Sequence, residues 1–324
     1  LGVFIMLLSF GLLILAGLFS GWIFSKIHLP RIIGMLIAGI LLGPYVLNLL
    51  DPSVINMSGD LRKIALIIII AKAGLSLDVT DLKRIGRPAV MLCFVPATFE
   101  LLAFILFAPS IMGVTVLQAA ILGAVMGAVS PAVTVPRLTK MIDEGYGVKK
   151  GIPQMLIAGA SADDVYVIVL FTTLVGLEAG GSVNAANFLK IPMEIVSGAL
   201  LGALLGILLS VYFKKIHIRD SLKITIIMAF NMLLYWLEGI APVSGLLAVM
   251  TMGIAINMKI PSVAKKLSLK FSKLWVAAEI FLFVLVGSIV NIDYVTEAGI
   301  GMVLMLFIGL LFREVGTLIS ILGT

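Results

Sequence analysis

The chain has 324 residues, of which 61% are hydrophobic and only 12% are charged, and its mean hydropathy is +1.21. Soluble domains do not have this balance, so the composition excludes a soluble or nucleic-acid-binding protein and predicts an all-α protein that crosses the lipid bilayer many times. The net charge of +6 is therefore interpreted through its distribution between the membrane faces. Cys93 is the only cysteine, which excludes disulfides within the chain and cysteine-rich metal sites.

Apolar runs close to twenty residues long predict eleven transmembrane helices. In chain order they are 2–24, 31–49, 62–78, 86–108, 115–138, 151–177, 188–213, 220–237, 241–258, 270–291 and 298–320. The first run has neither a basic start nor a small-residue cleavage site, so it is interpreted as a helix of the mature protein and not as a signal peptide.

The Lys and Arg residues between these helices are distributed very unevenly. If the helices alternate in direction, eighteen basic residues face one side and three, Arg62, Lys63 and Lys190, face the other. Basic residues collect on the cytoplasmic side of membrane proteins. The pattern predicts a multi-pass protein of the cell membrane with cytoplasmic basic loops and the N-terminus outside.

Two isolated charges inside predicted helices, Glu100 and Arg313, point to an internal repeat, because other features recur at nearly their offset of 213 residues. The further pairs are Pro30 and Pro242, Gly39 and Gly253, and Gly74 and Gly287, which are 212, 214 and 213 residues apart. A shift of seven helices reverses orientation across the membrane. The pattern therefore predicts an inverted repeat, an architecture of secondary transporters.

We expect this repeat to organise one transmembrane transporter domain. The expected ranges are 1–324 for the whole domain, 1–178 for the first repeat, 187–215 for a linker helix and 216–324 for an incomplete second repeat. Symmetry-related groups near the midplane can approach each other, so we predict an ion pair between Glu100 and Arg313. The alternative is that each charge snorkels separately or faces a water-filled cavity.

The predicted helix 115–138 contains Ser130, Pro131 and Pro136 within its apolar run. Each proline removes a donor and clashes with the preceding turn, so we expect the helix to be broken between the two prolines. Broken helices at membrane depth form ion sites in transporters. The alternative is a kinked packing helix in which Gly127 makes a close contact.

Asp163 and Asp164 are adjacent at the centre of the segment 151–177, which carries no other charge. A helix rises about 1.5 Å per residue, so both carboxylates are predicted near the bilayer midplane. A charge at that depth costs on the order of 3 kcal/mol by insertion scales, which makes the pair a candidate functional site.

Sodium binds to several oxygen ligands, and the local supply consists of Asp164, Asp163, Ser161 and Thr134. Neighbours on a helix point about 100° apart, so one aspartate is expected to carry the exchange while the other assists. Burial and the adjacent like charge both favour a bound proton. A carboxylate that holds either a proton or a cation is the minimum requirement for antiport.

These segments resemble the cation/proton antiporter superfamily, and within it the sodium/proton exchangers that carry an Asp-Asp pair on the sixth of thirteen helices. The resembling motifs are GAVSPAVTVP, GASADDVYVIV, AKAGLSLD, PATFE and FREVGT. The resemblance implies that Asp164 is the principal residue that binds Na+ and carries the proton, with Asp163 beside it. It also implies an elevator-like cycle in a homodimer, without a cofactor.

Arg313 stands where relatives carry lysine or arginine, which leaves the charge stoichiometry open. The repeat offset places the counterpart of Pro131 near position 344, beyond Thr324. We therefore expect an antiporter-like fold with a discontinuous helix that is truncated at the C-terminus, with about 11 of 13 helices present.

The predicted function is exchange of Na+ or Li+ for H+ through competition at Asp164 and Asp163. A sodium-coupled symporter of an organic anion is an alternative, although it predicts hydroxyl and amide ligands in place of the Asp-Asp pair. A potassium/proton antiporter is another, although such relatives usually carry a nucleotide-binding domain. An intramembrane aspartyl protease needs aspartates on separate helices, so no enzyme is predicted.

Overall fold

The computed structural model describes residues 2–77, 79–129, 131–178, 185–216, 218–293 and 299–322. Within these ranges, side chains are described except at 2–5, 79–85, 131–132, 158, 160–162, 164–165, 168–169, 172, 176 and 185–191. Asp164, Ser161 and Pro131 thus have a described backbone only, and Ser130 lies outside the described residues.

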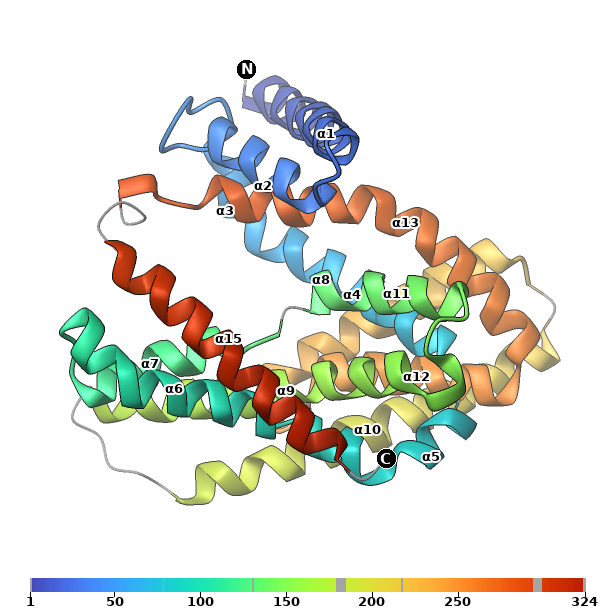
Figure 1. The fold of residues 1–324 in the computed structure, drawn as a ribbon. Helices are drawn as coiled ribbons and strands as arrows, with labels where there is room; N and C mark the ends of the chain where they lie inside the picture. The colour runs from blue at the N-terminus through green and yellow to red at the C-terminus, as the bar shows by residue number, and fades with distance from the viewer. Residues whose placement is uncertain are drawn as a thin grey trace. The chain divides into compact units, whose positions relative to one another are not determined.

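Every regular element in the described part of the chain is a helix (Figure 1). The elements are α1 Gly2–Lys26, α2 Arg31–Leu42, α3 Pro52–Asn56, α4 Ser58–Ser76, α5 Val79–Leu92, α6 Val95–Met112, α7 Val116–Met126, α8 Pro131–Asp143, the 3-10 helix η1 Val148–Lys150, α9 Ile152–Glu178, α10 Ala185–Lys215, α11 Asp220–Glu238, α12 Gly245–Lys259, α13 Pro261–Ser288 and α15 Gly299–Ile321.

Five helices of the described chain are long and apolar enough to cross a membrane. They are Met6–Lys26, Gly86–Met112, Pro192–Lys215, Asp220–Glu238 and Gly299–Ile321. Shorter apolar helices are Arg31–Leu42, Val116–Met126 and Gly245–Lys259. Each of these eight overlaps one of the predicted spans.

The predicted helix 86–108 is interrupted at its start, because α5 ends at Leu92 and α6 begins at Val95. Pro96 occupies the first turn of α6, and its ring nitrogen cannot donate to the carbonyl of Leu92. Gly86 adds a second irregularity inside α5, with φ of 31° and ψ of −108°. The chain is therefore bent just before it reaches the predicted charge at Glu100.

The predicted helix 115–138 is also broken, but the predicted position of the break was wrong. The described interruption includes 127–129, between α7 and α8, and Pro136 is inside α8. Pro131 is the first residue of α8, where a proline is tolerated because the first N–H groups of a helix have no intrahelical partner. A proline can therefore begin the second helix as well as break the first.

The chain divides into two compact units, and the first comprises Leu1–Ile69 with Leu269–Glu297. In this unit α2 crosses α13 so closely that a Cβ added to Gly39 would lie 2.0 Å from the carbonyl oxygen of Val284. A Cβ on Gly287 would lie 2.1 Å from the carbonyl oxygen of Leu36. Only glycine allows the two backbones to pass at this distance.

The second unit comprises Ile70–Ser268 with Ala298–Thr324, and ten of the fifteen residues of its helix α12 are buried. Three glycines of α10 spaced four residues apart, Gly198, Gly202 and Gly206, contact the backbone of α12 or of its N-cap residue. On α4, a Cβ on Gly74 would lie 2.2 Å from the carbonyl oxygen of Met250. Small residues thus allow α4 and α10 to pack closely against α12.

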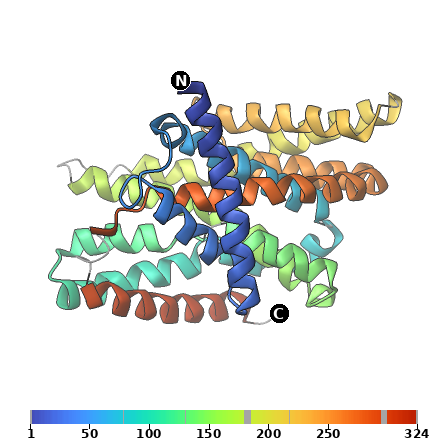
Figure 2. The same ribbon diagram turned by 90° about the horizontal axis from the view of Figure 1, so that it is seen from above.

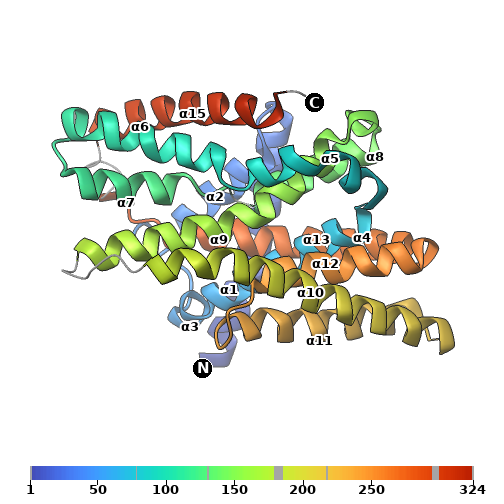
Figure 3. The ribbon, with the colours of Figure 1, turned by 90° about the horizontal axis from the view of Figure 1, so that it is seen from below.

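The helices that carry the candidate site all belong to the second unit. Figures 2 and 3 show α15 alongside α6, and the helices are in extensive contact. Helix α9 packs against α5, α7 and α8. Thr115 and Gln118 form a capping box that fixes the start of α7, and Gly113 ends α6 with φ of 69°.

Candidate functional site

Small residues on α15 bring Arg313 against α6. Gly309 and Gly316 are buried four residues before and three residues after Arg313, so all three lie on about the same helix face. A Cβ on Gly309 would lie 3.3 Å from Cγ of Glu100, and one on Gly316 would lie 2.9 Å from Cα of Pro96. The close packing directs the arginine at the buried part of α6.

The guanidinium of Arg313 meets three acceptors from three other helices. Its Nη1 donates to Oε2 of Glu100 at 2.5 Å and to the carbonyl oxygen of Gly127 at 2.8 Å. Its Nη2 lies 3.6 Å from Oδ2 of Asp163. The structure therefore brings together two features that are separate in the sequence: the ion pair of Glu100 and Arg313, and one member of the aspartate pair.

The bond to Gly127 gives a hydrogen-bond donor to a carbonyl at the C-terminal end of α7, where the predicted helix is broken. Gly127 is the C-cap residue of α7, and the last carbonyls of a helix have no intrahelical partner. A cationic side chain at this end both donates a hydrogen bond and interacts favourably with the helix dipole. Arg313 thus stabilises the end of the broken helix as well as the two carboxylates.

The electrostatics of the cluster are those of a buried, paired site. Glu100 is 3% exposed and Asp163 is 2% exposed, while the side chain of Arg313 is 16% exposed. Buried charges are tolerated when they are paired and hydrogen-bonded. When all three groups are ionised, two carboxylates share one guanidinium, and the one excess negative charge is suited to a proton or a small cation.

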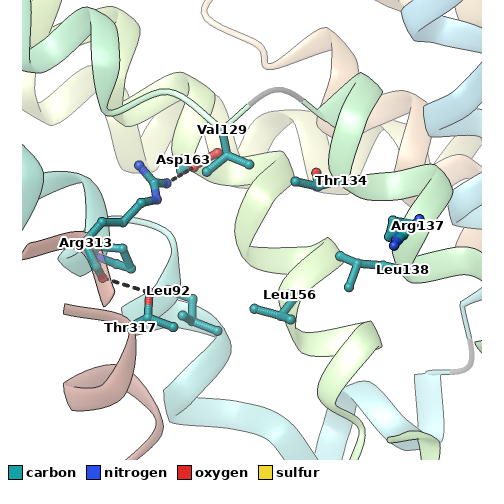
Figure 4. A pocket seen from close by; sticks show the side chains of 10 residues that line it. Leu92, Val129, Thr134, Arg137, Leu138, Leu156, Asp163, Arg313 and Thr317 are labelled. Atoms are coloured by element: carbon teal, nitrogen blue, oxygen red, sulfur yellow. Dashed lines mark hydrogen bonds and ion pairs between the residues drawn. The ribbon is translucent and has the colours of Figure 1, made fainter. Parts of the chain in front are cut away.

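A cavity of about 240 Å³ lies beside this cluster (Figure 4). Its lining residues come from α5, α6, α8, α9, α15 and the break after α7, and they are Leu92, Pro96, Val129, Thr134, Arg137, Leu138, Leu156, Asp163, Arg313 and Thr317. The walls are largely apolar, with Asp163 and Arg313 together in one part and Thr134 and Arg137 on α8. The cavity provides room for a small solute beside the carboxylate of Asp163.

Of the predicted ligand residues, Asp163 and Thr134 line this one cavity. Asp164 and Ser161 belong to α9, but their side chains lie outside the described residues. Within the predicted discontinuous-helix site, Pro131 begins α8 and Pro136 lies inside it.

Three contributions to the site were not predicted from the sequence. The carbonyl of Gly127 carries no side-chain signal, although its place four residues before Pro131 marks the end of α7. Thr317 follows Arg313 by one helical turn and donates to its carbonyl oxygen at 2.9 Å. Arg137 directly follows Pro136 and had been counted only as a cytoplasmic charge.

Comparison with known proteins identifies the family. A family model described as sodium/hydrogen exchanger, transmembrane, matches residues 11–323. Sodium/hydrogen exchanger 9B2 of Homo sapiens is 39% identical over 171 residues, which are 52% of this chain and 32% of that protein. Sodium/hydrogen exchanger 9B1 of Macaca fascicularis is 30% identical over an alignment 335 residues long, which covers 94% of this chain and 65% of that protein. The chain thus spans between about a third and just under two thirds of these relatives.

The fold has a close counterpart among solved structures. The sodium proton antiporter MjNhaP1 from Methanocaldococcus jannaschii aligns with 100% of this chain and 80% of its own, with a TM-score of 0.79 and 20% sequence identity. The predicted all-α, polytopic, antiporter-like fold is confirmed by this similarity. The apolar helices and the family match together identify a multi-pass membrane protein. Because the family model covers residues 11–323, the chain belongs to the sodium/hydrogen exchanger family.

Proposed function

We propose that the protein is a secondary active transporter that exchanges Na+ or Li+ for H+ by alternating access. Cation and proton compete for Asp164, and Asp163 assists. The observation that carries the proposal is the cluster in which Arg313 holds Glu100 and lies 3.6 Å from Asp163 beside a cavity. Glu100, Asp163 and Arg313 together carry one net negative charge when all three are ionised, which favours a proton or a small cation beside them.

The proposed cation ligands are Asp164, Asp163, Ser161 and Thr134, together with carbonyls freed by the break around Ser130. Na+ favours such oxygen ligands. Two features support the set: Thr134 and Asp163 line one cavity, and the break between α7 and α8 lies beside it. The carbonyl of Gly127 already accepts a hydrogen bond from Arg313, so the carbonyls that follow Gly127 are the better candidates for cation ligands.

Two glycine crossings support the proposed inverted repeat. In the first unit Gly287 faces the carbonyl of Leu36, and in the second Gly74 faces the carbonyl of Met250. Leu36 and Met250 are 214 residues apart (250 − 36), and Gly74 and Gly287 are 213 apart (287 − 74). One contact therefore maps onto the other when the halves of the chain are exchanged. The repeat boundaries stay as predicted, with 1–178 and 216–324 joined by 187–215.

The same proposal includes a homodimer in the cell membrane, with the N-terminus outside and the basic loops in the cytoplasm. The support for this orientation is the uneven distribution of Lys and Arg between the predicted faces, and the homodimer rests on the family resemblance. Accessibility of single cysteines in the loops, measured in a Cys93→Ala background, tests the orientation. Labelling from outside at a loop that carries the basic residues would contradict it.

The exchange itself is tested with the full-length protein in liposomes under an imposed pH gradient. Addition of Na+ or Li+ is expected to move protons in the parent protein and to have no effect in Asp164→Asn. The matched control is Asp60→Asn, because the Asp60 carboxylate is exposed near the start of α4 and pairs only with Lys63 in the described structure. Undiminished proton movement in Asp164→Asn would refute the mechanism.

The same liposomes separate the competing transporter classes. Proton movement driven by K+ alone would indicate a potassium/proton antiporter. Sodium uptake that requires an organic anion and moves no protons would indicate a symporter. Repeating the assay with and without a membrane potential distinguishes electrogenic from electroneutral exchange.

A further inference from the structure

Tyr166 and Thr98 join α9 to α6 close to the two buried carboxylates. The hydroxyl oxygens of the two side chains are 2.7 Å apart. Tyr166 is three residues after Asp163 on α9, so the two share about the same face of the helix. Thr98 is two residues before Glu100 on α6. The bond therefore connects the segments that carry the two acidic partners of Arg313.

The direction of this bond follows from the other contact of Thr98. Its Oγ1 also lies 2.7 Å from the carbonyl oxygen of Phe94, which can only accept. A hydroxyl has one proton, so Thr98 donates to Phe94 and accepts from Tyr166. The ring of Tyr166 also meets the ring of Phe94 edge to face, with centroids 6.3 Å apart. Tyr166 is thus anchored at Phe94, the N-cap residue of α6.

This hydrogen bond is a direct link between two helices that share α7 as a neighbour but hardly contact each other. In the described part of the chain α9 packs against α5, α7, α8 and α10, and approaches α6 only marginally. Arg313 nevertheless requires α6 and α9 in register, because one guanidinium meets Glu100 at 2.5 Å and Asp163 at 3.6 Å. A long side chain with a terminal hydrogen bond can set the distance between helices that do not pack directly.

We propose that Tyr166 is a positioning residue for ion exchange, which acts through Asp163 by holding α9 at a fixed distance from α6. The proposal rests on the function proposed above. Loss of the hydroxyl leaves the ring packed but frees α9 to shift relative to Arg313. Asp163 then no longer meets the bound cation in one fixed geometry, so the affinity for the cation falls. The conformational change of the transport cycle is unaffected, so the maximal rate is retained.

The test compares Tyr166→Phe with Thr98→Val, which keeps the shape of threonine. The full-length protein in liposomes is assayed for the apparent KM for Na+ and the maximal rate. Each variant is expected to raise KM about two- to tenfold, the range for one lost hydrogen bond, with the maximal rate within about twofold of the parent. The double variant is expected to match the single ones, because both remove the same bond.

Two controls separate positioning from general damage. Thr98→Ser retains the hydroxyl and is expected to restore the parental KM. Tyr146→Phe removes an equivalent hydroxyl from an exposed turn after α8 and is expected to change nothing. An unchanged KM in Tyr166→Phe, or additive effects in the double variant, would overturn the positioning role while exchange by the parent stands. Absence of exchange in the parent would overturn the proposed function and this role together.

Discussion

Neutralising the acid or the base of the central ion pair is predicted to have unequal consequences. Glu100→Gln leaves Arg313 with the carboxylate of Asp163 and the carbonyl of Gly127. Arg313→Gln removes the guanidinium that both Glu100 and Asp163 meet. The arginine substitution is therefore expected to destabilise the protein more than the glutamate substitution, although the two residues form one pair.

The distances give the size of the difference. Coulomb attraction falls as 1/r, so Asp163 at 3.6 Å supplies about 70% of the attraction that Glu100 supplies at 2.5 Å. Arg313 thus keeps about 40% of its attraction after Glu100→Gln. Removing one partner of a buried pair costs about 3–5 kcal/mol when the other is left uncompensated. We expect about that loss for Arg313→Gln and about half of it for Glu100→Gln.

The measurement is the free energy of unfolding in mixed micelles for the two single variants and the double variant. The double variant is expected to be more stable than the sum of the single losses predicts, because one neutral partner relieves the other. Equal losses in the two single variants, or strict additivity, would refute the cluster as described. Exchange of the two charges is a poorer test, since Arg313→Glu would place a carboxylate next to Asp163 where the guanidinium had been.

Two further predictions concern packing and pH. Gly202→Val should lower the free energy of unfolding by about 3 kcal/mol, because a Cβ there would lie 2.1 Å from the carbonyl oxygen of Ala248. The control is Gly11→Val, because a Cβ on Gly11 would meet nothing within 4 Å. A similar loss of unfolding free energy in both variants would contradict the close contact. Hydrogen bonds from Ser53 lower the pKa of Asp51, so this N-cap of α3 stabilises the helix above the unfolded pKa near 3.8 and loses its effect as pH falls through the lower folded value. Faster amide exchange in 53–57 below pH 4, absent from Asp51→Ala, is the expected result; equal acid sensitivity in both proteins would contradict it.

Much of the fold could be predicted from the sequence because membrane helices are specified by long apolar runs. The contact between Glu100 and Arg313 was also predicted from the sequence, in this case from two isolated charges separated by 213 residues. That inference needed only the repeat offset and the high cost of an unpaired charge at membrane depth. Spacing and electrostatics are both properties that a single sequence contains.

The remaining contacts could not be predicted, for reasons specific to each residue. Proline disfavours the interior of a helix but suits its first turn, so Pro131 alone does not decide on which side a break lies. The carbonyl of Gly127 is an acceptor that every residue possesses, and only the end of α7 makes it available to Arg313. The choice of Asp163 as a partner depends on the rotation of α9, which sequence neighbours cannot fix.

Electrostatics also explain why the two equivalent positions of the proposed repeat, Glu100 and Arg313, hold opposite charges. In the proposed repeat, residues separated by the offset exchange places when the two halves are exchanged, so a contact between Glu100 and Arg313 maps onto itself. In an exact repeat both positions would hold the same residue. Two glutamates or two arginines at 2.5 Å in a buried site would repel strongly. In the proposed repeat, one acid and one base in place of two like charges convert that repulsion into attraction, and Arg313 also contacts Asp163 and the carbonyl of Gly127.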